Sequence, residues 1–316
     1  MKAQNYELKS QEIKEQFLKL KKQNPESFKK RLKFSWSNWG FGVEELETTA
    51  KRLNRFGIKF IELHGNLYGQ DLGYKSEEVK KILSNYDIET AGICGMFSAD
   101  NDLSSDRPII RQNAIDYIKR NIEFGSKVGA KYFLIVPGAV GRPTAYDDME
   151  FHRSVESIKI VADIFVKTDI RGAVEPVRSV EVSFCHTFKD AKEYINSVAS
   201  PGIRHINGDL YHMLVEESHI GETIVNAKDM LTNLHMADTN RGALGDGSLD
   251  LDTIIMALYV IGYNNDDCCF STPEPLGPGG DPYPAMYGKP DSSKLDNLVK
   301  KSVEYFKERE DIVLSL

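Results

Sequence analysis

The stretch IKFIELHG, residues 58–65, is a short apolar run, and it is followed by the segment SEEVKKILSNYD, residues 76–87. The first has the length and apolar content of a buried strand, whereas the second has the apolar spacing of an amphipathic helix. The chain repeats this strand-then-helix unit, and the repetition indicates the fold.

The same alternation occurs eight times between residues 32 and 310. The other apolar runs are LKFSWS (32–37), IETAGICGMF (88–97), KYFLIVPG (131–138), IRGAVEPV (170–177), IRHINGDL (203–210), LTNLHMAD (231–238) and DCCFSTPEP (267–275). Eight successive units predict an α/β protein with a parallel sheet, closed as a (β/α)8 TIM barrel. An open doubly wound sheet is the competing architecture, but SWSNWGFG follows the first strand instead of a G-x-G-x-x-G phosphate loop.

Residues 1–31 precede the strand-helix repeats and are rich in Lys, Glu and Gln. Ile13, Phe17 and Leu20 recur at helical spacing. We therefore predict an N-terminal helical extension at 1–31 and a TIM barrel catalytic domain at 32–316. The extension is a solvated face, a packing helix or a subunit contact.

Charge and composition narrow the possible partners. The net charge is −7 and no basic block stands out, which disfavours nucleic acid as a partner. The four cysteines lack paired-ligand spacing, and no apolar run is long enough to span a bilayer. We expect a cytoplasmic protein without a membrane partner.

Four successive strands end in a potential metal ligand. In a TIM barrel the chemistry lies at the C-terminal ends of the strands, and here strands five to eight end at Glu175, Asp209, His235 and Glu274. Each residue alone is more often a solvated polar group, but four in register on neighbouring strands favour a metal site. Such an oxygen-rich set predicts one divalent ion, with Mn²⁺ first and Mg²⁺ or Co²⁺ as alternatives.

This pattern resembles the ketose 3-epimerases (D-tagatose or D-psicose 3-epimerases) within the xylose-isomerase-like TIM barrels. The matching motifs are VEPVRSVE, GDLYHM, HMADTNR and PEP, and the similarity covers roughly residues 33–308. The resemblance implies an isomerase in which the four strand-end residues bind the metal. Companion residues of the same motifs hold the oxygens of the substrate in that family, and here they are Glu181, His212 and Arg241.

The resemblance also suggests a mechanism. A metal that holds a ketose by its carbonyl and an adjacent hydroxyl acidifies the carbon between them and stabilises an enediolate. We expect Glu175 and Glu274 to act as acid and base on opposite faces of that carbon, and His64, at the end of strand two, to contact the substrate. Proton transfer between adjacent carbons on one face would instead give aldose–ketose isomerisation. The expected partner is a small-molecule sugar, and the expected assembly is a homo-oligomer, either a dimer or a tetramer.

Three other functions are alternatives to an epimerase. A lyase or dehydratase acting on a keto-sugar or inosose, including cleavage of 3-oxo-glycosides, would use the same metal site. An AP endonuclease is disfavoured by seven histidines and the negative charge, and a non-enzymatic sugar-binding barrel would lack the complete ligand set. The aromatic loop in ELHGNLYGQDLGY (62–74) and the Gly- and Pro-rich loop in EPLGPGGDPYPAMYGKPDSS (274–293) depart from the family, so the sugar can differ. The absence of a clear phosphate loop favours an unphosphorylated one.

Overall fold

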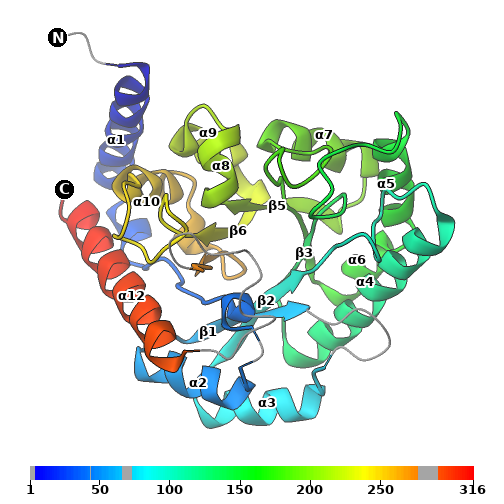
Figure 1. The fold of residues 1–316 in the computed structure, drawn as a ribbon. Coiled ribbons are helices and arrows are strands. Elements are labelled where there is room, and N and C mark those ends of the chain that lie inside the picture. The colour runs from blue at the N-terminus through cyan, green and yellow to red at the C-terminus, as the bar shows by residue number, and fades with distance from the viewer. Residues whose placement is uncertain (1–3, 43, 66–72, 277–290) are drawn as a thin grey trace.

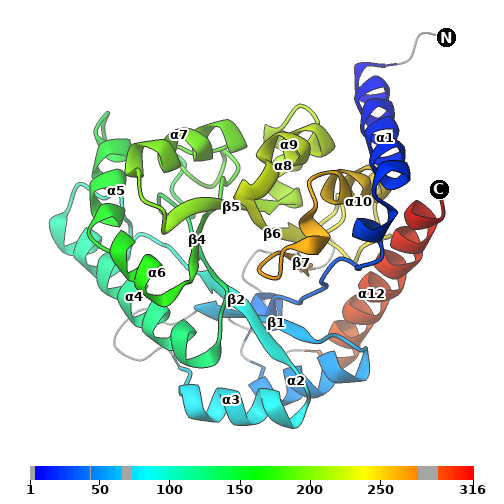
Figure 2. The same ribbon diagram turned by 180° about the vertical axis from the view of Figure 1, so that it is seen from behind.

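The computed structural model describes residues 4–42, 44–65, 73–276 and 291–316, and it shows a parallel sheet ringed by helices (Figure 1). The strands are hydrogen-bonded in chain order: β1 (Phe60–Gly65), β2 (Glu89–Gly95), β3 (Tyr132–Ile135), β4 (Arg171–Val174), β5 (Ile203–Asp209), β6 (Leu231–Met236) and β7 (Phe270–Pro273). Figure 2 shows β7 beside β6 from behind. This order, with every neighbouring pair parallel, confirms the predicted α/β class and TIM barrel.

The sheet is closed by a segment that is not a regular strand. Phe34 forms a parallel bridge with Ser271 of β7, and Ser37 forms one with Glu62 of β1. Backbone hydrogen bonds from residues 33–37 therefore reach β7 on one side and β1 on the other. The first of the eight predicted strands therefore lies where closure requires it, but its pairing consists of isolated bridges and not of a continuous strand.

Helices cover the outside of the sheet in the order of the chain (Figure 1). The barrel helices are α2 (Leu46–Arg55), α3 (Ser76–Asn85), α4 (Pro108–Val128), α5 (Glu150–Lys159), α6 (Ala162–Thr168), α7 (Phe188–Val198), α8 (Leu210–Glu216), α9 (Ile220–Ala227), α10 (Leu251–Val260) and α12 (Ser292–Ser315). Short 3-10 helices occur at Pro25–Phe28, Asn38–Phe41, Lys228–Met230 and Tyr263–Asn265. Within the described residues, no helix has both the length and the apolar run needed to cross a membrane.

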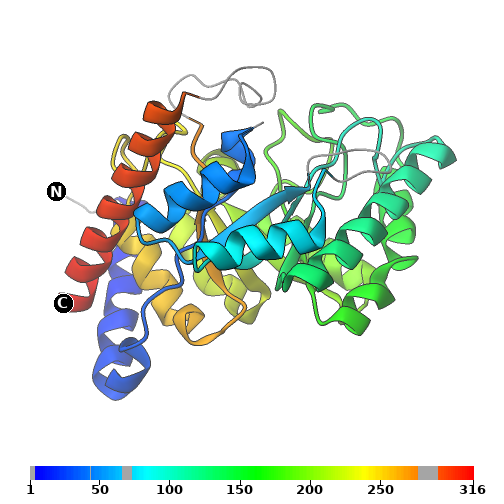
Figure 3. The same cartoon turned by 90° about the horizontal axis from the view of Figure 1, so that it is seen from below.

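The N-terminal helix α1 (Asn5–Gln23) lies on the same flank of the barrel as α12, as the side view shows (Figure 3). Its apolar stripe is buried against α9 and α10. The Phe17 ring lies 5.3 Å from Phe28 and 6.2 Å from Tyr259 of α10, between ring centroids. The predicted helix is thus present as a packing helix, while the domain boundary at residue 31 stays a prediction. The two loop segments at 66–72 and 277–290, singled out in the sequence, lie outside the described residues.

Candidate active site

The four predicted metal ligands project from neighbouring strand ends. Asp209 is the last residue of β5 and is in register with His235 of β6. Glu175 and Glu274 directly follow β4 and β7. The backbone N–H of Glu175 donates to a carbonyl of β3 at 2.9 Å, and that of Glu274 donates to a carbonyl of β6 at 2.8 Å. The sheet therefore fixes the backbone from which each of these side chains extends.

The side chains converge around one nitrogen of His235. Its Nδ1 atom lies 3.8 Å from Oε1 of Glu175 and 3.6 Å from Oε2 of Glu274. Donor atoms of Glu175, Asp209 and His235 all lie within 4.8 Å of one another. Bonds of about 2 Å to a divalent ion hold neighbouring donors roughly 3 Å apart, so a small contraction brings these donors to coordination distance.

Several buried carboxylates lie close together in the site, and their mutual repulsion favours the binding of a cation. Burial raises the pKa of Glu274 to about 8, and the carboxylates of Glu62, Asp209 and Glu175 add to this while His235 opposes it. Burial alone would lower the pKa of His235, but the carboxylates of Glu274 and Glu62 raise it well above its ordinary value. A buried cluster of this kind attracts a cation, and its oxygen and imidazole donors fit one divalent ion.

A second possible donor group shares His235 and Glu274 but adds Glu62 and Cys94. Burial, followed by the surrounding carboxylates, raises the pKa of the Cys94 thiol well above its ordinary value, and a protonated thiol is a poor ligand. Glu62 faces the other ring nitrogen, Nε2 of His235, at hydrogen-bond distance. We therefore assign Cys94 to the wall of the cavity.

A cavity of about 280 Å³ lies at these residues and has the size of a small-molecule site. It is lined by Trp39, Cys94, Gly95, Met96, Phe97, Ser98, Val136, Val140, Glu175, Val177, Glu181, Asp209, His212, His235, Arg241 and Glu274. The structure thus brings together all four predicted ligands and three of the four predicted substrate-binding residues.

Two buried polar atoms at this cavity have no hydrogen-bond partner in the described protein, Nη1 of Arg241 and Nδ1 of His212. The Arg241 guanidinium lies over the rings of Trp39 and Tyr211, at 5.3 and 4.3 Å from their centroids. On His212, Nε2 lies 3.4 Å from Oδ2 of Asp209. Because buried polar atoms are normally paired, these two are available to oxygens of a ligand.

The fourth predicted contact, His64, does not line this cavity. Its ring lies 5.8 Å from that of Tyr74, between centroids, and it lines a separate cavity whose other residues come largely from α2 and α3. Burial lowers the pKa of His64 to about 4, so the ring is neutral near pH 7. Its role in substrate binding stays a prediction.

The sequence assigned no role to two groups that contact the predicted ligands. Ser37 Oγ donates to Oε1 of Glu274 at 2.9 Å, and Glu62 pairs with His235. A signal for Glu62 was present in FIELHG, because a carboxylate inside an apolar strand is costly unless it is paired.

Comparisons with known proteins agree with this fold. A family model described as the xylose isomerase-like TIM barrel matches residues 50–309, and the chain belongs to that family. The chain is 25% identical over 244 residues to the 3-dehydro-D-guloside 4-epimerase of Escherichia coli (strain K12), covering 73% of this chain and 89% of the relative. It is 24% identical over 228 residues to the ketose 3-epimerase of Arthrobacter globiformis, covering 71% of this chain and 76% of the relative.

A solved structure of the D-allulose 3-epimerase from Methylomonas sp., in complex with D-allulose, has the same fold. Its TM-score is 0.75 at 21% identity, over 89% of this chain and 98% of that one. The named relatives are epimerases, and epimerases are isomerases, which confirms the predicted enzyme class.

Proposed function

We propose that this protein is a divalent-metal-dependent epimerase that inverts a carbon next to the carbonyl of a ketose or keto-sugar, through an enediolate. One observation carries the proposal. Glu175 and Glu274 flank Nδ1 of His235 at 3.8 and 3.6 Å, at a cavity where Arg241 and His212 hold unpartnered nitrogens. The epimerase names of the relatives support the same reaction class.

The residues that would hold the metal are Glu175, Asp209, His235 and Glu274. When bound, a divalent ion supplies Lewis-acid polarisation of the substrate carbonyl and its neighbouring hydroxyl. Glu175 follows β4 and Glu274 follows β7, so the two carboxylates approach the cavity from either side of β5 and β6. One carboxylate removes the proton from the carbon, and the other delivers a proton to the opposite face, which inverts the centre.

The remaining polar residues bind the oxygens of the substrate. Arg241 and His212 donate to the oxygens on which negative charge develops. Glu181 accepts from a sugar hydroxyl, since its carboxylate is already oriented by a hydrogen bond from Nε of Arg178. Trp39 and Phe97 supply apolar wall against the faces of the sugar.

The substrate is a small, unphosphorylated sugar. The cavity volume of about 280 Å³ suits a monosaccharide-sized ligand. Among the described residues that line it, Arg241 is the sole lysine or arginine, which is a weak set of donors for a phosphate group. The relatives divide between ketoses and a 3-dehydro-guloside, so both substrate types belong in the first screen.

The proposal includes manganese as the first ion to test, with magnesium and cobalt next. A cytoplasmic location, a homo-oligomer of two or four chains, and a barrel domain that begins at residue 32 belong to it as well. Gel filtration with light scattering measures the assembly directly.

The test is a screen of the metal-loaded protein in deuterated water, with metal content measured by elemental analysis. Free ketoses and 3-dehydro-glycosides are the substrates, and NMR follows both exchange of the carbon-bound hydrogen and appearance of the epimer. We expect exchange and epimer formation on at least one sugar, lost with a chelator and restored by Mn²⁺. An unsaturated or cleaved product without an epimer would instead identify a lyase.

A further inference from the structure

Glu62, a residue outside the predicted ligand set, is the most deeply buried carboxylate next to the site. It lies on β1, across the barrel from β6, and its side chain is fully buried. Its Oε1 and Oε2 atoms lie 2.9 and 3.0 Å from Nε2 of His235. Since an ionised carboxylate only accepts hydrogen bonds, this contact requires a proton on Nε2.

Other side chains hold Glu62 in place. Tyr132 of β3 donates from its hydroxyl to Oε2 at 2.7 Å, and Asn233 of β6 donates from Nδ2 to the same oxygen at 3.3 Å. Asn233 is itself fixed by Thr272, whose hydroxyl donates to Oδ1 at 2.7 Å. The position of Tyr132 depends on Gly92, because a Cβ there would lie 2.4 Å from the tyrosine ring.

A second contact points to the same state of the imidazole. Nδ2 of Asn207 lies 3.4 Å from Nδ1 of His235, while Oδ1 of Asn207 accepts from Asn233 at 2.7 Å. An amide nitrogen only donates, so this contact fits the tautomer that has its lone pair on Nδ1. In its neutral form, which is the form that binds a metal ion, the ring thus presents Nε2–H to Glu62 and a lone pair on Nδ1 toward Glu175 and Glu274.

We propose that Glu62 is a positioning residue, which fixes the tautomer and the orientation of His235 so that Nδ1 is the atom that binds the divalent ion. The inference rests on the proposed function for the presence of that ion. Metal-binding histidines commonly donate their second N–H to a carboxylate, and loss of such a partner typically costs 10- to 100-fold in affinity or activity. Glu62 touches neither the ion nor the sugar, and acts through His235.

The experiment compares wild type with Glu62→Gln, and uses Tyr132→Phe as the matched control. Tyr132→Phe removes one hydrogen bond to Glu62 but leaves the Glu62–His235 contact in place. Binding of Mn²⁺ and Zn²⁺ is measured by competition with a chelator, without any sugar, and circular dichroism establishes the folded fraction. We expect Glu62→Gln to weaken binding about 10- to 100-fold per folded molecule and Tyr132→Phe to change it less than about threefold.

Nitrogen NMR of the Zn²⁺-loaded protein reads the tautomer itself. The seven histidines are resolved by comparison with His235→Gln. We expect a protonated Nε2 and a metal-bound Nδ1 in wild type, and a loss of this single state in Glu62→Gln. Equal affinity of wild type and Glu62→Gln, or metal on Nε2 in wild type, would overturn the inference even if the enzyme proves to be an epimerase. Tight metal binding that depends on Glu62, with no exchange on any sugar, would instead overturn the proposed function alone.

Discussion

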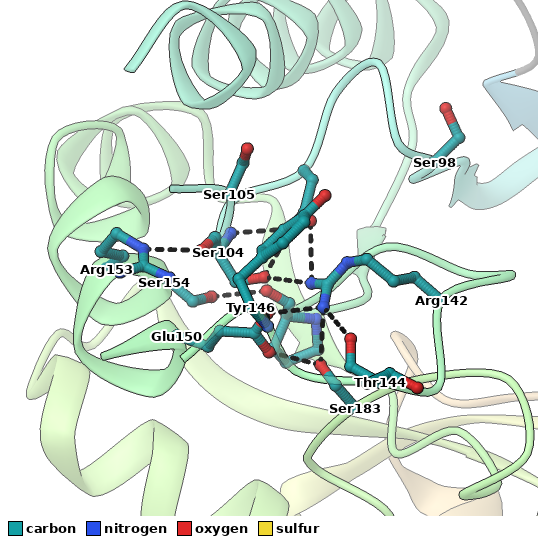
Figure 4. A network of polar contacts seen from close by, with 12 residues as sticks. Ser98, Ser104, Ser105, Arg142, Thr144, Tyr146, Glu150, Arg153, Ser154 and Ser183 are labelled. Atoms are coloured by element: carbon teal, nitrogen blue, oxygen red, sulfur yellow. Dashed lines mark hydrogen bonds and ion pairs between the residues drawn. The ribbon is translucent and has the colours of Figure 1, made fainter. Parts of the chain in front are cut away.

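Two arginines near the C-terminal ends of the strands, the partly buried Arg142 and the buried Arg241, differ in what their guanidinium groups contact. Arg142 donates to the carboxylates of Asp102 at 2.9 Å and Glu150 at 2.5 Å, and to Ser104 at 2.9 Å. Figure 4 shows Arg142 among Ser104, Glu150 and Ser183. Arg241 has no carboxylate within ion-pair distance in the part of the chain that the structure describes, and it lies over aromatic rings instead.

The network around Arg142 joins three loops that surround the cavity. Asp102 follows β2, Arg142 follows β3, and Ser183 follows β4; Ser183 is 3.3 Å from Nη1 of Arg142. The backbone N–H of Arg142 also donates to the carbonyl of Glu181 at 3.0 Å. The network therefore supports the loop that carries Glu181 to the cavity.

The different contacts of Arg142 and Arg241 indicate different roles for the two arginines. A buried guanidinium that is paired with carboxylates keeps its neighbours neutralised, and its removal leaves them charged without a partner. Each guanidinium also has a buried nitrogen without a partner in the described residues, Nε of Arg142 and Nη1 of Arg241, but only Arg241 lines the cavity, where a ligand can bind it. We infer that Arg142 stabilises the loops, and we expect Arg241 to bind the substrate.

The largest effect on stability is expected for Arg142→Met, which leaves Asp102 and Glu150 buried without their cation. Breaking a buried ion pair costs about 3–5 kcal/mol, so the free energy of unfolding in urea should fall by that amount. Lys127→Met, which removes an exposed pair with Glu123, is the control and should leave unfolding close to wild type. A loss below about 1 kcal/mol for Arg142→Met would show that the loops do not depend on this network.

For Arg241→Asn we expect a loss of activity without a loss of stability. Asparagine tolerates the left-handed backbone that Arg241 adopts at φ 59°, so the change removes the guanidinium without adding strain. Loss of a donor to developing charge lowers kcat by about 10²–10³-fold, whereas the metal content and the urea midpoint should stay near wild type. If Arg241→Asn unfolds as readily as Arg142→Met, the two arginines do not differ as described.

A smaller effect is expected at Tyr211, whose ring lies between Arg178 and Arg241 at 4.4 and 4.3 Å. Tyr211→Leu removes the ring that orients Arg241, and cation–π contacts of this kind contribute about 0.5–2 kcal/mol. We expect kcat/KM to fall by roughly tenfold, while Tyr211→Phe keeps the ring and most of the rate. Equal losses in Leu and Phe variants would assign the effect to the hydroxyl instead.

The sequence predicted the parts of the site that follow from barrel topology. Glu175, Asp209, His235 and Glu274 end consecutive strands, and consecutive strands of a barrel are neighbours, so their convergence needs no knowledge of side-chain packing. Arg241 could be proposed from its motif, but its place over two aromatic rings could not be predicted.

Contacts across the barrel and between loops could not be predicted. Glu62 meets His235 from 173 positions away, and Arg142 meets Asp102 from 40 positions away, through geometry that only the closed fold creates. The strand-end rule that brings Asp209 and His235 to one cavity also predicted a substrate contact for His64, whose ring packs against Tyr74 beside a separate cavity, and that contact stays a prediction. The strand-end rule predicts at which end of the barrel a residue lies. It does not predict which residues its side chain will contact.

The most direct test of the central claim measures proton exchange and inversion separately in Glu175→Gln and Glu274→Gln. Glutamine keeps an oxygen for the metal but removes the basic carboxylate, so both variants should retain some metal and the fold. General acid–base catalysis contributes about 10²–10⁴-fold, and epimer formation should fall by at least that range in each variant. The variant that keeps the base on the correct face should still exchange the carbon-bound hydrogen with deuterated water. Near wild-type epimerisation by both variants, with bound metal confirmed, would contradict the two-glutamate mechanism.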